Sequence, residues 1–450
     1  MPTTGACECA RDLAAPACLA LAGAFLLAVT GLQTMAFTDY EGEAEPALLA
    51  LRHGHVWAFL HHLPAYGGSL ILRAPFALLP AAWHGGDLAL FRTMAAPCLL
   101  AAVALAVVLH HRARGYGAGG AAAWLVLLLT AANPLTLRAL ETGHPEELLG
   151  GALCVAAGLA AIARRPLLAG VLVGAAMANE PWAVVAVAPI MLMLPDRRRR
   201  ALACSVGVAA LLVAPMFLLS GGALTSTVAV AHGSGAIFQP WQLWWFLGDH
   251  GHRVMGVYGE KVGYRTPPLW VTRVSHLLVV LVPVAAALLV ARRRPTLGPA
   301  AGFALLALAL QLRCLLDTWD AVYYALPACL ALVAWEVHAR RPPLVALTTV
   351  ALTWSTFELL PKAVSPDVQA AVYLAWSLPL VCGLGLAILR PVAWTRVTSS
   401  AAKVLRRELP TLARAYAMTC SSLGSDDTTS APSSVTITRS SMRTPTAPGT

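Results

Sequence analysis

Charged residues are scarce in this chain. Asp, Glu, Lys and Arg make up 12% of its 450 residues, about half the share found in ordinary soluble domains. Hydrophobic residues make up 58%, and the mean hydropathy is +0.68. Apolar runs of about 18 or more residues recur, and each is long enough to cross about 30 Å of hydrocarbon. The runs are continuous rather than alternating, which disfavours a β-barrel. The composition therefore predicts an all-α, polytopic membrane protein.

Two motifs of soluble enzymes and pumps are also missing. The sequence has no Walker motif and no Gly-x-Ser-x-Gly elbow, which disfavours ATP-driven transport and serine hydrolysis. It has no Cys-x-x-Cys, and its ten cysteines lie mostly inside apolar runs, as small buried side chains do. The net charge of +10 comes largely from short arginine clusters between apolar runs, which is a pattern of membrane topology. We therefore expect no nucleic-acid partner.

The basic clusters determine the expected topology. Such clusters mark the cytoplasmic side of a membrane protein, so successive clusters must be separated by an even number of crossings. This rule gives about twelve transmembrane helices in the plasma membrane, with both termini in the cytoplasm. The clusters are residues 110–114, 164–165, 197–200, 292–294, 340–341 and 390–396.

Two segments need separate treatment. Residues 166–195 would form a helix of about 45 Å, which is too long for one crossing. We expect a hairpin of two short helices that turns at Asn179-Glu180-Pro181. Residues 69–83 contain an arginine and two prolines, and we expect them to form a juxtamembrane helix along the outer surface. The next crossing would then span residues 89–109.

The expected domain organisation follows from these assignments. Residues 1–15 form a cytoplasmic N-terminal tail, and residues 16–390 form the transmembrane domain. Residues 391–420 form a basic cytoplasmic segment. Residues 421–450 are rich in Ser, Thr and Pro and are expected to be disordered.

Four carboxylates crowd together directly after the first apolar segment, on the expected outer face. They are Asp39, Glu41, Glu43 and Glu45. A carboxylate that is partly shielded by a loop and surrounded by like charges can have a raised pKa, which suits a general base that deprotonates a hydroxyl. The alternative is a solvated acidic loop without a chemical role.

Two more outer segments combine groups that could carry chemistry. Residues 141–147 hold His144 beside carboxylates that include Glu146, a set that can relay a proton or bind a metal, or can simply begin a helix. Residues 313–324 combine a cation, two carboxylates and three aromatic rings. Aromatic rings beside carboxylates are typical of carbohydrate sites, and the alternative is an aromatic belt at the membrane interface.

Two polar features complete the candidates. Glu180 lies at the expected hairpin turn, and a polar group at membrane depth favours a functional role unless the turn reaches the surface. The large outer loop over about residues 221–275 contains four cations, which could hold a lipid phosphate or could balance the outer acids. These cations are Arg253, Lys261, Arg265 and Arg273.

Four segments together are similar to a known family. They are residues 143–149 (Gly-His-Pro-Glu-Glu-Leu-Leu), 169–183, 238–245 (Phe-Gln-Pro-Trp-Gln-Leu-Trp-Trp) and 317–327 (Asp-Thr-Trp-Asp-Ala-Val-Tyr-Tyr-Ala-Leu-Pro). With them, residues 15–390 resemble actinobacterial integral-membrane proteins of the glycosyltransferase family 87 (DUF2029) type, within the GT-C superfamily. The resemblance implies a GT-C-like fold and an inverting transfer of a sugar, mannose- or arabinose-like. The donor would be a polyprenyl-phosphate sugar and the acceptor a lipid or glycan on the outer membrane face.

The resemblance also implies roles for residues. Such enzymes commonly place an acidic base in the first outer loop, and Asp39 is the best match, with Glu41 in reserve. We expect Arg253, Lys261 and Arg265 to bind the donor phosphate. The residues expected to line the sugar or acceptor site are His144, Glu146, Trp241, Arg313, Asp317, Trp319, Asp320 and Tyr324.

The sequence departs from the family pattern at two places. Related sequences often carry Lys near Asn179-Glu180, and the usual aromatic-Pro-Pro of the first loop is present only as residues 62–66. No cofactor is assigned, and a divalent cation remains an option. The alternative functions are a transporter or flippase of lipid-linked sugars and a non-catalytic membrane protein. A transporter should show paired repeats and charges deep in its crossings, whereas the charges here lie at the ends of the apolar runs.

Overall fold

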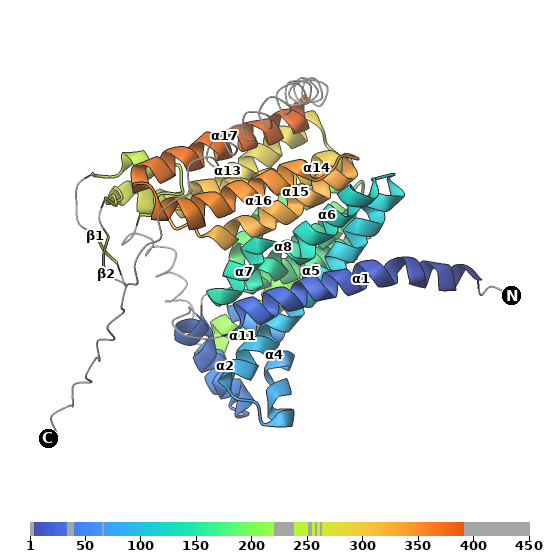
Figure 1. The fold of residues 1–450 in the computed structure, drawn as a ribbon, viewed down its shortest axis with the longest axis horizontal. Helices are drawn as coiled ribbons and strands as arrows, with labels where there is room; N and C mark the ends of the chain where they lie inside the picture. Colours follow the sequence, from blue (N-terminus) through green and yellow to red (C-terminus); the bar gives the residue numbers. More distant parts are fainter. Residues whose placement is uncertain are drawn as a thin grey trace, which may run out of the picture. The chain divides into compact units, whose positions relative to one another are not determined.

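The computed structural model describes residues 4–33, 40–64, 67–219, 238–250, 254–256, 259–261 and 263–390. Within these ranges the regular structure is helical apart from one antiparallel hairpin of strands β1 (Val254–Gly256) and β2 (Gly259–Lys261). The helices lie side by side in a bundle (Figure 1). Its main members are α1 (Thr4–Gly31), α5 (Asp87–Gly115), α6 (Gly120–Ala131), α7 (Pro134–Glu141), α8 (Glu146–Ile162), α9 (Pro166–Asn179), α10 (Val187–Met193), α11 (Arg198–Leu219), α13 (Leu269–Arg293), α14 (Pro299–Leu316), α15 (Leu326–His338), α16 (Leu344–Trp354) and α17 (Pro366–Leu389).

Eight helical segments of the described chain are long and apolar enough to cross a membrane. They lie in α1, α5, α6 with α7, α11, α13, α14, α16 with the turns after it, and α17. The other four predicted crossings fall on the shorter helices α8, α9, α10 with the 3₁₀ turn η3 (Pro181–Ala186) before it, and α15 with the 3₁₀ turn η5 (Val322–Ala325) before it. The structure is therefore all-α and polytopic in character, and the number of twelve crossings stays a prediction.

Residues 166–193 turn back on themselves at Glu180. Helix α9 ends at Asn179, Glu180 has extended backbone angles (φ −146°, ψ 124°), and η3 and α10 follow. A Cβ atom added to Gly150, near the start of α8, would lie 3.0 Å from the Trp182 ring, so the turn lies beside the first turns of α8. Helix α10 then packs against α8 and α14. The chain thus has the two short helices that its length predicts.

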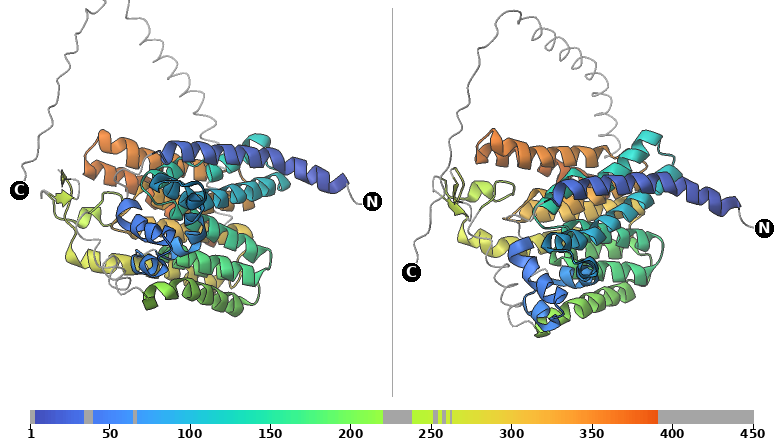
Figure 2. Two further views of the ribbon diagram at one scale, coloured as in Figure 1. Left: turned by 90° about the horizontal axis from the view of Figure 1, so that it is seen from below. Right: turned by 60° about the horizontal axis from the view of Figure 1, so that its bottom comes forward.

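The first loop folds into short helices on one side of the bundle (Figures 1 and 2). They are the π-turn η1 (Tyr40–Ala44), α2 (Glu45–Arg52), α3 (Val56–His61), α4 (Gly67–Ala77) and the 3₁₀ turn η2 (Leu79–Trp83). The sequence predicts one helix over residues 69–83, but the structure has two, since a residue that precedes a proline, as Leu79 does, disfavours the α conformation. Helix α4 is also packed rather than free: a Cβ atom on Gly68 would lie 2.0 Å from the carbonyl oxygen of Ala178.

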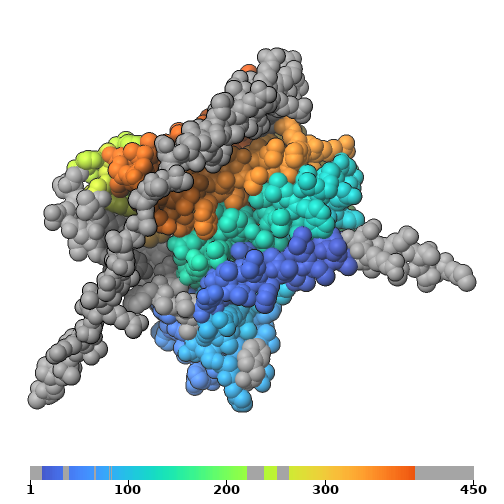
Figure 3. Space-filling view, viewed as in Figure 1, coloured from blue at the N-terminus to red at the C-terminus, as the bar shows by residue number. Residues whose placement is uncertain are grey.

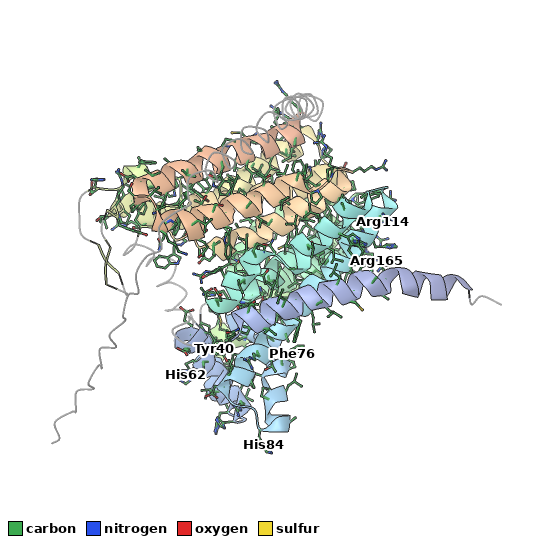
Figure 4. The ribbon with its side chains drawn as sticks, viewed as in Figure 1. Tyr40, His62, Phe76, His84, Arg114 and Arg165 are labelled. Carbon is green, nitrogen blue, oxygen red and sulfur yellow. The ribbon has the colours of Figure 1, made fainter. Side chains whose placement is uncertain are left out.

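Two of the arginine-rich turns and the start of the first loop lie at opposite ends of the bundle. Arg114 and Arg165 lie at one end and Tyr40 at the other (Figure 4). Helix α1 lies along α5, α6 and α7 on the face that Figure 3 shows. This separation agrees with the expected topology, and the orientation of the bundle in a bilayer stays a prediction.

Candidate functional site

Two adjacent glutamates begin helix α8 and are its only charged residues, and both are buried. Glu146 is 1% exposed and Glu147 is 4% exposed, and both follow Pro145. Carboxylates in the first turn of a helix are stabilised by the positive end of its dipole. Burial removes their hydration, however, so each needs a charged partner, and each has one.

Glu147 forms a two-pronged ion pair with Arg313 of α14. The Arg313 Nη2 atom lies 2.6 Å from Glu147 Oε1, and Nη1 lies 3.1 Å from Oε2. The indole nitrogen of Trp182 also donates to Oε1, at 3.1 Å. The guanidinium lies over the rings of Trp182, at 4.5 Å, and Tyr324, at 4.4 Å. A planar guanidinium suits both the forked pairing and the stacking, so Arg313 joins α8, η3, α14 and η5 at one point.

Glu146 joins a second set of elements. Its Oε2 accepts from Arg73 Nη2 of α4 at 3.0 Å, and its Oε1 lies 2.8 Å from Nδ1 of His144. The Asn179 amide donates to the backbone oxygen of Glu146 at 2.9 Å, and Ser69 donates to the Asn179 side chain at 3.0 Å. The first loop, α8 and the end of α9 are therefore joined by one buried polar network.

Glu180 lies between two members of this network and differs from them. Asn179 and Trp182, on either side of it, are both hydrogen-bonded to the start of α8. The Glu180 carboxylate is half-buried, and it makes no hydrogen bond or ion pair in the part of the chain that the structure describes. Its two hydrogen-bonded neighbours hold its backbone beside α8, so the carboxylate is available to a ligand, in keeping with the candidate role that its sequence position suggests.

The start of the acidic stretch lies against the loop that precedes α8. Gly143 has a φ of +89°, and a Cβ atom there would lie 2.7 Å from Cβ and 2.8 Å from the backbone nitrogen of Tyr40. The Tyr40 ring is buried, 4.6 Å from the ring of Phe91. Asp39 itself falls outside the described residues. Glu41, the second predicted base, is half-exposed in η1.

An aromatic row connects His144 to the second predicted segment. The His144 ring stacks on Tyr323 at 5.1 Å, and Tyr323 meets Tyr324 edge-on at 5.3 Å. Tyr324 in turn lies over the Arg313 guanidinium. Four of the predicted sugar-site residues are thus brought together at one end of the bundle: His144, Glu146, Arg313 and Tyr324.

The turn after α14 holds two acids, of which Asp320 is buried and Asp317 is partly exposed. Asp320 is 3% exposed, and its Oδ2 accepts from the Tyr373 hydroxyl of α17 at 3.2 Å. Asp317 accepts from the Trp319 backbone nitrogen at 3.0 Å and lies 3.9 Å from His276 Nε2 of α13. Burial raises the pKa of Asp317 and raises the pKa of Asp320 well above its ordinary range, to which the nearby Asp317 charge adds. Trp319, also predicted, is more exposed at the same turn.

Several buried polar atoms around this turn lack a partner. Asp320 Oδ1, Thr318 Oγ1 and the indole nitrogen of Trp241 make no hydrogen bond within the described ranges. Trp241 stacks on Phe357 at 4.4 Å, and Phe357 meets the Tyr373 ring at 6.0 Å. Buried polar groups are normally satisfied, so water or a ligand hydroxyl would complete them. We call Trp241, Asp317, Thr318, Asp320 and Tyr373 the Asp320 cluster.

Of the three residues predicted to bind the donor phosphate, the structure describes the side chain of Arg265 alone. Arg265 pairs with both oxygens of Asp367, at 2.9 and 3.0 Å, and its Nη1 donates to the Gly248 carbonyl oxygen at 3.1 Å. Its guanidinium therefore anchors the outer loop to the start of α17. Arg253 falls outside the described residues, and Lys261 ends β2 with its side chain undescribed. In the described part of the chain no three His, Cys, Asp or Glu side chains gather as a metal site.

The fold and the site define a class. The protein is a polytopic helical membrane protein with a network of buried ion pairs and aromatic rings at one end of its bundle.

A comparison with protein families identifies the family within that class. The family described as glycosyltransferase family 87 matches residues 68–318, more than half of the chain, and the chain belongs to this family. At the family level it is a membrane glycosyltransferase. No curated protein and no solved structure matches the chain. The matched range includes Arg73, Glu146, Glu147 and Arg313, whereas Asp39 and Asp320 lie outside it.

Proposed function

We propose that this protein moves a mannose- or arabinose-like sugar from a polyprenyl-phosphate donor to a lipid or glycan acceptor at the outer face of the plasma membrane. The contact between Tyr40 and Gly143 carries the proposal. It holds the residue that follows Asp39 against the loop of His144 and Glu146, which supports a single site formed by the first loop and the buried network.

Asp39 is the proposed general base. It takes the proton of an acceptor hydroxyl as the oxygen of that hydroxyl attacks the anomeric carbon of the donor sugar. The bond between that carbon and the phosphate oxygen breaks, polyprenyl phosphate leaves with the electron pair, and the anomeric configuration inverts. Support comes from Glu45 nearby, whose pKa is raised by burial and by the charges of Asp87 and Glu41, so the acidic stretch is not simply solvated.

The ion-paired residues serve as the frame of this site. Arg313 is held by Glu147 and between two rings, so its guanidinium positions Tyr324 and Trp182 beside the start of α8. Arg253 and Lys261 remain the proposed contacts for the donor phosphate. Arg265 has a structural role in this proposal because two of its guanidinium nitrogens already bind the carboxylate of Asp367.

The sugar hydroxyls have two groups of partners in this proposal. His144 and Glu146 border the first, and the Asp320 cluster with Trp319 forms the second. A sugar presents hydroxyls that both donate and accept, which matches the unpartnered Asp320 Oδ1, Thr318 Oγ1 and Trp241 nitrogen. Its apolar C–H face would pack on the exposed edges of the aromatic rings.

Transfer of labelled sugar tests the proposal. Membranes that contain the protein are given a panel of polyprenyl-phosphate sugars, including mannose and arabinose forms, and labelled lipid and glycan products are separated. Membranes without the protein are the control. Product that depends on the protein supports the proposal, and its absence for every donor, with expression verified, would overturn it.

A further inference from the structure

A hollow of about 530 Å³ lies at the end of the bundle opposite the candidate site. It is formed by the turn that joins α10 to α11 and the turn that joins α13 to α14, and it is lined by residues 195–200 with Pro295 and Thr296. The backbone nitrogen of Leu297 donates to the carbonyl oxygen of Leu192 at 2.8 Å, which ties the two turns together. Sites for small molecules have volumes of about 300–1,000 Å³, so the hollow is large enough for a phosphate-bearing headgroup.

The lining of the hollow carries an excess of positive charge. Arg198 donates to the carbonyl oxygens of Leu194 and Pro295, so it helps to build the walls. The side chains of Arg197, Arg199 and Arg200 form no ion pair or hydrogen bond with any residue that the structure describes. Asp196 is the one carboxylate in this lining, beside four arginines. Helix α11 begins here with no acidic residue in its first turn, so the positive end of its dipole adds to the positive charge.

Apolar surfaces begin next to the hollow and run along two helices. On α11, Leu202, Val206 and Leu211 are exposed, and on α13, Leu288 and Leu289 are exposed. Helix α11 lies at the margin of the bundle in both views of Figure 2. A phospholipid with its phosphate in the hollow would lay its acyl chains along these surfaces, whereas a soluble phosphate compound would make no contact with them.

We infer that the hollow binds the phosphate group of an anionic membrane phospholipid. Arg197, Arg199 and Arg200 contact the phosphate, and the acyl chains follow α11 and α13. This site is independent of the proposed sugar transfer because it uses different residues at the other end of the bundle.

Lipid retention by the purified full chain tests the inference. The protein in neutral detergent is mixed with phosphatidylglycerol or phosphatidylcholine of identical chains, and bound lipid is counted by native mass spectrometry. The variant is Arg197→Gln/Arg199→Gln/Arg200→Gln, and the control, Arg164→Gln/Arg165→Gln/Arg341→Gln, removes the same charge from other turns. We expect wild type and control to prefer phosphatidylglycerol, and the variant to bind it at least about fivefold more weakly.

Three results would overturn the inference. They are equal retention of the two lipids by wild type, an equal loss in variant and control, and binding of glycerol 3-phosphate without a preference for phosphatidylglycerol. The last result would assign the hollow to a soluble phosphate compound. Should the triple variant fail to fold, Arg199→Gln alone, at an exposed side chain, must still weaken phosphatidylglycerol binding.

Discussion

Glu147 and Arg313 are 166 residues apart in the chain, yet two hydrogen bonds of 2.6 and 3.1 Å join their side chains. Through this pair the first turn of α8 meets the last turn of α14. Rings of Trp182 and Tyr324 cover the guanidinium. The pair is buried and joined by two hydrogen bonds, the geometry that a buried ion pair needs to offset its loss of hydration.

Removing one partner of this pair should cost more than removing both. Glu147→Leu alone leaves a buried guanidinium without its counter-charge, which costs about 3–5 kcal/mol, whereas Glu147→Leu/Arg313→Met leaves no buried charge. We therefore expect the thermal unfolding midpoint in detergent to fall further for Glu147→Leu than for the double variant. A double variant whose unfolding midpoint falls as far as that of Glu147→Leu, or further, would contradict the role of the pair.

Gly143→Ala should separate the first loop from the candidate site. The left-handed conformation alone costs a non-glycine residue about 1–2 kcal/mol, and the new Cβ would also collide with Tyr40. Gly117→Ala is the matched control, because Gly117 has a similar φ of +84° with nothing within 4 Å. We expect sugar transfer and the unfolding midpoint to fall more for Gly143→Ala than for Gly117→Ala. Equal effects would mean that the contact with Tyr40 is unimportant.

The stability of the protein should depend on pH through Asp320. Burial raises the pKa of this carboxyl in the folded state above its unfolded value of about 4, so the folded state holds the proton more tightly. Stability should therefore fall as the pH rises from about 4 through the raised pKa. Asp320→Asn cannot ionise. Its unfolding midpoint should therefore rise relative to that of wild type over this pH interval and equal that of wild type at lower pH. Parallel curves of unfolding midpoint against pH for the two proteins would contradict the raised pKa of Asp320. The control is Asp87→Asn, which changes an exposed ion pair.

Local patterns in the sequence predict much of the architecture. The length of residues 166–195 predicts the hairpin at Glu180, and the structure ends α9 at Asn179. The Pro145-Glu146-Glu147 sequence is typical of a helix start, and α8 begins at Glu146. Both features depend on residues near one another in the chain, so periodicity and helix-dipole effects are enough to find them.

The pairing of charges could not be predicted in the same way. Arg73 lies in an apolar stretch, which signals a buried partner, but that partner, Glu146, is 73 residues away. Arg265 looks like a free cation in the sequence, yet Asp367, 102 residues later, holds it. Nothing near Tyr373 in the chain points to Asp320, 53 residues earlier, although the two side chains are hydrogen-bonded. Such contacts depend on how helices pack, which a single sequence does not determine.

The Asp39→Asn variant tests the central claim most directly. Initial rates of sugar transfer are measured with the donor that gives product, for wild type, Asp39→Asn, Glu41→Gln and Asp87→Asn at matched expression. We expect Asp39→Asn to lose about 10²- to 10⁴-fold in rate, as removal of a general base does, with an unchanged unfolding midpoint and near-normal rates in the other two variants. A wild-type rate in Asp39→Asn would contradict the assignment of Asp39 as the base.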